Sequence, residues 1–196
     1  MLLYILGDAP RRSLLKEAIS LITLLAFSLM LGQFFLARSN EAVINLFDRK
    51  HIQNVHKAIA YPALIIFLVH PFLIVFPRYF EAGVDPVDAL LMMLTSFDNR
   101  GILLGMVAWA LLVIIALTAI FRMRLIKRYR IKYRDWRKFH GYMTVAFVVL
   151  AIWHAIELGR HTDRIMAAFF IALAIAGITL LFRLYFGAAS KTVEIR

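Results

Sequence analysis

Five apolar stretches, each long enough to cross a lipid bilayer, restrict this chain of 196 residues more than any other feature. A helix needs about 20 consecutive apolar residues to span the hydrocarbon core. Such stretches lie at about 14–36, 52–76, 101–121, 139–158 and 164–186. Because backbone amides in lipid must find partners within the protein, the stretches should be helical. The sequence therefore predicts an all-α integral membrane bundle with five transmembrane helices.

Positive charge predicts which side of the membrane each loop occupies. Nine Lys or Arg residues fall between Arg122 and Lys138, and a short loop so rich in these residues stays cytoplasmic. Counting the predicted spans from this loop places the C-terminus in the cytoplasm and the N-terminus outside. Sixteen of the 23 Lys and Arg residues then lie on the cytoplasmic side. We predict a multi-pass protein of the bacterial inner membrane whose net charge of +11 meets anionic lipid and not nucleic acid.

Two of the predicted helices each hold a pair of histidines fourteen residues apart. The segment 56–70 reads HKAIAYPALIIFLVH, and the segment 140–154 reads HGYMTVAFVVLAIWH. Fourteen residues of α-helix turn through about 1400°, which is nearly four full turns, and rise about 21 Å. Both histidines of a pair therefore face nearly the same side of their helix, one near each membrane face.

The spacing and topology together suggest two cofactor sites at different depths. Ionisable groups inside a span are costly and are usually functional. A neutral imidazole is a standard axial ligand of haem iron, and the chain has no cysteine that could serve instead. The two ligand levels, about 21 Å apart, suit two stacked haems better than one ion site, whose ligands would converge on a point. The predicted metal ligands are His56 with His140 at the cytoplasmic side and His70 with His154 at the outer side.

Two cations lie beside the inner pair in the sequence. Arg137 precedes His140 by three residues, and Lys57 follows His56 directly. Either cation could pair with the propionate carboxylates of an inner haem, while a role as an interfacial anchor stays equally open. His161, at the edge of a span, is expected to be a solvated loop residue or part of an outward basic patch.

Around these histidines the chain resembles the ferric reductase-like transmembrane domain, which ferric reductases, NADPH oxidases and the haem subunit of the bacterial methionine sulfoxide reductase system share. The motifs that carry the resemblance are VHKAIAYPALIIFLVHP at 55–71 and YRDWRKFHGYMTVAFVVLAIWH at 133–154, where the second contains the family's Trp-Arg-x-x-His pattern. The resemblance implies two haem b groups on the four histidines. It also implies the transmembrane haem module of an oxidoreductase.

The same resemblance implies an electron route. Electrons would come from FAD or FMN on an NAD(P)H-dependent cytoplasmic partner or missing domain, and would leave to oxygen, ferric iron or a periplasmic protein at the outer face. Family members commonly have six spans, so a sixth helix in a longer chain is a further hypothesis. Residues 1–190 would form the haem domain. The tail at 191–196 could be the first strand of a flavin domain or equally a natural tail. The chain has no glycine fingerprint for binding a nicotinamide cofactor.

Two alternatives stay open. One is the haem subunit of a methionine sulfoxide reductase-like system, which takes electrons from quinol or flavin; loss of one histidine site would indicate it, and both sites look complete. The other, from a different class, is a non-redox membrane transport or assembly protein whose histidines bind ions.

Overall fold

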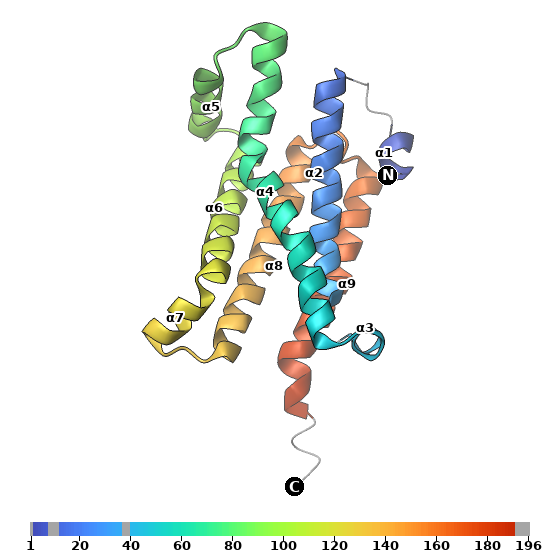
Figure 1. Ribbon diagram of the computed structural model, residues 1–196. Helices are drawn as coiled ribbons and strands as arrows, with labels where there is room; N and C mark the ends of the chain where they lie inside the picture. The colour runs from blue at the N-terminus through green and yellow to red at the C-terminus, as the bar shows by residue number, and fades with distance from the viewer. Residues whose placement is uncertain (1, 8–11, 37–39, 191–196) are drawn as a thin grey trace.

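The computed structural model describes residues 2–7, 12–36 and 40–190, and every element in these ranges is a helix (Figure 1). Within this part of the chain, five helical segments are long and apolar enough to cross a membrane: Leu14–Leu36, Lys50–Ala82, Arg100–Ile120, Tyr133–Leu158 and Arg164–Arg183. The predicted all-α membrane bundle is thus confirmed. The predicted tail at 191–196 lies outside the described residues.

The helices follow one another with short connections. In chain order they are α1 (Leu2–Leu6), α2 (Leu14–Gly32), η1 (Gln33–Leu36), α3 (Glu41–Leu46), α4 (Arg49–Ala82), α5 (Pro86–Thr95), α6 (Arg100–Ile120), α7 (Arg122–Tyr129), α8 (Tyr133–Leu158) and α9 (Arg164–Ser190). Side-chain caps define the residue at which several helices begin. Asp48, Asp85, Asn99 and Asp163 each accept a bond from a backbone N–H in the first turn of α4, α5, α6 and α9 respectively.

Helix α4 is longer than the sequence predicts. We expected this span to end near residue 76 because of its prolines, and that boundary is wrong. The helix continues through Pro71 and Pro77 to Ala82, since packing inside a membrane bundle compensates for the backbone bond that a proline removes. It ends at Gly83, whose φ of 64° is a left-handed conformation that glycine adopts without strain.

The segments between the spans are also largely helical. The predicted surface helix at DALLMMLTSF is present as α5, and with ten residues it is too short to cross a bilayer. The basic segment 122–138, which we predicted to be a loop, contains α7, an eight-residue helix. Helix α8 then begins at Tyr133 and not near residue 139, so it includes the Trp-Arg-x-x-His motif.

The ends of the helices gather at two opposite ends of the molecule. Helices α3 and α7 lie at one end, and α1 and α5 lie at the other (Figure 1). At the α5 end, Lys16 and Ser13 at the start of α2 bond the carboxylate of Glu81 at the end of α4. His161, between α8 and α9, approaches Glu17 of α2 at the same end, with 3.1 Å between Nε2 and Oε2. The helices therefore alternate in direction, as expected of consecutive spans joined by short connections.

Two antiparallel pairs organise the bundle. Helices α6 and α8 share the most extensive contact, α2 and α4 form the second pair, and α9 packs on α2, η1 and α8. The central buried residues come from α2, η1, α6, α8 and α9: Phe27, Leu31, Phe34, Ala108, Leu112, Ile115, Phe147, Val148, Ile152, Met166, Phe170 and Ala174. Helix α4 adds only the partly buried Leu64 and Phe67 to this cluster. The two histidine-bearing helices, α4 and α8, make little or no direct backbone contact among the described residues.

Candidate functional site

The outer histidines of α4 and α8 lie opposite each other. The ring centres of His70 and His154 are 6.4 Å apart, and the ring planes are perpendicular, at 90°. Both side chains are half-buried. The structure therefore brings together the two residues that topology places at the same depth.

The separation of these rings fits two axial ligands of one metal ion. A nitrogen–metal bond of about 2.0 Å on each side, with about 1 Å from each ring nitrogen to its ring centre, separates the two ring centres by about 6 Å. The distance of 6.4 Å between His70 and His154 is close to this value. The separation of the ring centres and the donor chemistry of this pair are therefore compatible with a bis-histidine haem.

Helix α6 orients the His154 ring. Nδ1 of His154 lies 2.7 Å from the carbonyl oxygen of Gly101. Since a carbonyl can only accept, this bond requires Nδ1 to carry the proton, which leaves Nε2 as the nitrogen with a free lone pair. Ligating histidines usually make such a bond from the nitrogen that does not bind the metal.

Gly105, one turn further along α6, gives this ring its space. A Cβ atom at residue 105 would lie 2.6 Å from both Cε1 and Nδ1 of His154. Real Cβ atoms essentially never come this close to another heavy atom. The absence of a side chain at Gly105 therefore leaves room for the His154 ring. The sequence did not indicate this role, because Gly105 lies in an otherwise apolar helix.

At the inner level, His140 is held by an aromatic stack. Trp136, one turn earlier on α8, stacks on the His140 ring with ring centres 5.3 Å apart. The indole Nε1 of Trp136 donates to the carbonyl of Thr118 on α6 at 3.2 Å. His56 of α4 is exposed and, among the described residues, makes no ring contact with His140, unlike His70 with His154. The tryptophan of the Trp-Arg-x-x-His motif therefore serves to orient the histidine and is more than a membrane-interface residue.

Two arginines approach the inner level with unpaired nitrogens. The guanidinium of Arg122 lies over the Trp136 ring, 5.2 Å from its centre. Nε of Arg122 and Nε of Arg137 are both buried without a hydrogen-bond partner among the described residues. An unsatisfied buried donor is costly, so both arginines are suited to a carboxylate ligand such as a haem propionate. Lys57, the other predicted cation, is exposed beside His56.

The histidines themselves also carry unpaired nitrogens. Nδ1 of His70 and Nδ1 of His140 are buried with no hydrogen-bond partner in the described part of the chain. Buried polar atoms without partners are uncommon and often mark functional sites. No cluster of three or more His, Cys, Asp or Glu side chains able to hold a metal occurs within the described residues. Each pair would supply two ligands, the number that haem iron takes from a protein in bis-histidine sites.

His161 does not occupy the position expected of it. We predicted a solvated loop residue or part of a basic patch, but its side chain is only 7% exposed. It packs against the ring of Tyr4, with 4.4 Å between ring centres, and pairs with Glu17. The sequence did not predict the burial of His161, because its partners, Tyr4 of α1 and Glu17 of α2, lie far away in the sequence.

The fold and the outer pair define a class: a multi-pass membrane protein in which two helices each carry two histidines fourteen residues apart and bring the outer two together. The comparisons with known proteins agree. Residues 22–151 match the family of the ferric reductase like transmembrane component, and the chain belongs to this family. The matched region includes His56, His70 and His140 and ends three residues before His154.

A relative is known from an archaeon. An uncharacterized protein of Archaeoglobus fulgidus is 35% identical over 164 residues, which cover 84% of this chain and 87% of the relative. No solved structure matches the chain.

Proposed function

We propose that this protein is the transmembrane module of an oxidoreductase and carries electrons across the membrane through two b-type haems. His56 with His140 would hold one haem, and His70 with His154 the other. The observation that carries the proposal is the outer pair, whose ring separation of 6.4 Å suits two ligands on one iron. Membership of the ferric reductase-like family supports the same redox class.

The residues around the histidines have distinct tasks in this proposal. The Gly101 carbonyl sets the tautomer of His154, and Trp136 orients His140. Arg122 and Arg137 would bind the propionates of the inner haem through donors that are otherwise unpaired. When bound, haem supplies reversible one-electron chemistry at its iron. Since two histidines of this chain would hold each haem, an acceptor would have to react at the edge of the site.

We place the α7 end of the molecule in the cytoplasm. The basic segment 122–138 lies there, and a short loop so rich in Lys and Arg resists translocation. The electron donor, a reduced flavin on a partner protein or domain, would then act at the α7 end. The acceptor would act at the α5 end.

Single cysteines can test this orientation, because the natural chain contains none. In intact cells, a membrane-impermeant maleimide should label Asp98→Cys, which lies between α5 and α6. Lys127→Cys on α7 should react only after the cells are opened. Both side chains are exposed, so burial does not limit the reaction. The reverse labelling pattern would contradict the orientation while leaving the haem sites untouched.

A visible spectrum tests the redox proposal itself. Protein purified from cells supplied with haem should show a Soret band and, after reduction with dithionite, the sharp α and β bands of six-coordinate iron. Carbon monoxide should leave the reduced spectrum nearly unchanged, because two histidines would already be bound to each iron. Well-folded protein without haem would refute the proposal and would favour the ion-binding alternative.

A further inference from the structure

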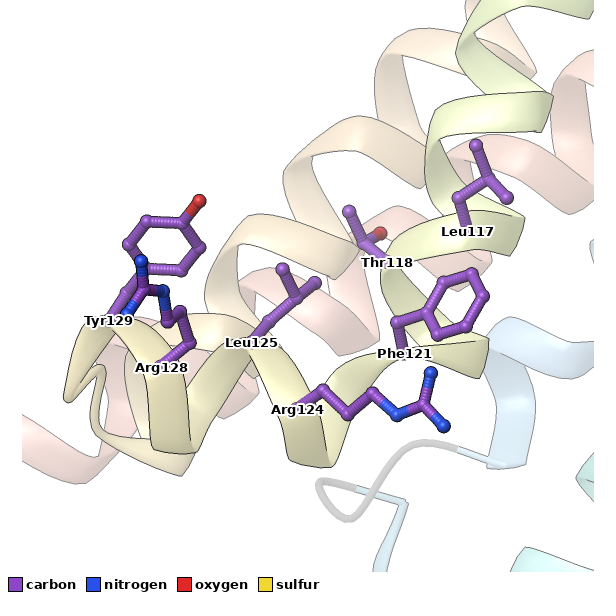
Figure 2. A pocket seen from close by; sticks show the side chains of 7 residues that line it. All are labelled: Leu117, Thr118, Phe121, Arg124, Leu125, Arg128 and Tyr129. Carbon is purple, nitrogen blue, oxygen red and sulfur yellow. The ribbon is translucent and has the colours of Figure 1, made fainter.

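A groove separate from the histidine pairs lies where α6 meets α7. Its volume is about 390 Å³. The last turn of α6, its C-cap and helix α7 provide the lining: Leu117, Thr118, Phe121, Arg124, Leu125, Arg128 and Tyr129. Figure 2 shows Arg124 beside Phe121 towards one end of the groove and Arg128 beside Tyr129 at the other, with Leu125 between them.

The lining has an apolar part and a cationic part. Leu117, Phe121 and Leu125 offer hydrocarbon surface. Arg124 and Arg128 are four residues apart on α7, so they lie on one face of the helix about 5–6 Å apart at Cβ. Within the described residues, neither arginine forms an ion pair with a carboxylate. The guanidinium of Arg124 lies over the Phe121 ring, 5.5 Å from its centre. The groove therefore presents two exposed positive charges that no carboxylate neutralises among the described residues, beside an apolar surface.

The position of the groove matches the depth of lipid phosphates. The membrane-spanning helix α6 ends at Ile120, and α7 begins two residues later, so the groove crosses from the hydrocarbon core to the interface. Basic helices at this depth attract anionic lipids. Two other ligands fit the groove less well. A zwitterionic lipid carries its own compensating cation, and a free anion has no acyl chain to cover the apolar part of the lining.

We propose that this groove binds an anionic phospholipid. One acyl chain would lie along Leu117, Phe121 and Leu125, and the phosphate would bind between Arg124 and Arg128. The proposed lipid contacts involve no histidine; among the described residues, Thr118 alone connects the groove to the inner level, through the bond that its carbonyl accepts from Trp136.

A pair of matched double variants tests the site. Arg124→Gln with Arg128→Gln removes both groove cations, whereas Lys127→Gln with Lys132→Gln removes two charges from the same basic segment outside the groove. All four side chains are exposed, so neither variant should disturb folding. Detergent-purified proteins would be titrated with phosphatidylglycerol and the bound lipid counted by native mass spectrometry. We expect the groove variant to bind about tenfold more weakly or worse, and the control to bind like wild type.

Three results would overturn the proposal. Equal losses in both double variants would mean that only overall charge matters. Equal binding of phosphatidylcholine by the wild type would mean that the groove does not select an anion. Displacement of the lipid by glycerol phosphate at equal concentration would mean that the acyl chain adds nothing, which would indicate a soluble-anion site.

Discussion

Replacing His70 with alanine should leave a protein that binds about half as much haem as the wild type, because only one of the two bis-histidine levels loses a ligand. The inner histidines lie about 21 Å away along their helices and keep their own surroundings. Nδ1 of His70 has no hydrogen-bond partner among the described residues, so the substitution breaks no hydrogen bond of this atom. Haem per chain would be measured by the pyridine haemochrome method.

Further variants show whether His70 and His154 act as a pair. His154→Ala should also lose about half the haem, and the double variant should lose no more than either single one, because the two residues share one site. His51→Ala is the control, since this histidine is exposed in the first turn of α4 and lies outside both pairs. Additive losses, or full haem retention in His70→Ala, would contradict the two-level arrangement.

A methyl group added at residue 105 should disturb the outer site without replacing either proposed ligand. In Gly105→Ala the new Cβ would lie 2.6 Å from the His154 ring, so either the ring or helix α6 must move. Such overpacking typically costs about 1–3 kcal/mol. We expect a lower thermal unfolding temperature, and a lower occupancy or a shifted reduction potential of the outer haem, with the inner haem unchanged.

Gly32→Ala provides the matched control for this variant. A Cβ atom at residue 32 would meet nothing within 4 Å, although this residue too lies in a membrane-spanning helix. This substitution should leave the haem content and both reduction potentials at wild-type values. If Gly105→Ala behaved in the same way, α6 would not determine the position of His154.

The sequence was sufficient for the parts of this structure that depend on local periodicity. Hydropathy located the five spans, because length and apolarity alone decide which segments can cross a bilayer. The repeat of 3.6 residues per turn placed both histidines of each pair on one side of a helix. The positive charges of the loops then predicted which histidines of the two helices lie at the same depth. The close approach of His70 and His154 agrees with this pairing.

Features that depend on packing between helices were not predictable in this way. The contact of Gly105 with His154 joins residues 49 positions apart, and nothing near Gly105 in the sequence indicates it. In the sequence, nothing distinguishes Arg122 from the other eight basic residues of its segment. Its position over the Trp136 ring is seen only in the structure. The end of α4 was missed because its prolines were expected to break a helix that its neighbours stabilise.

The division of the bundle into two antiparallel pairs bears on how the protein is assembled in the cell. Helices α2 and α4 form one hairpin, and α6 and α8 form the other. Each proposed haem level takes one histidine from each hairpin, so neither hairpin contains a complete site. Transmembrane helices can insert before they associate, and both hairpins can therefore reach the membrane before any ligand pair exists. We expect haem capture to be a late step of biogenesis, after the two hairpins have met.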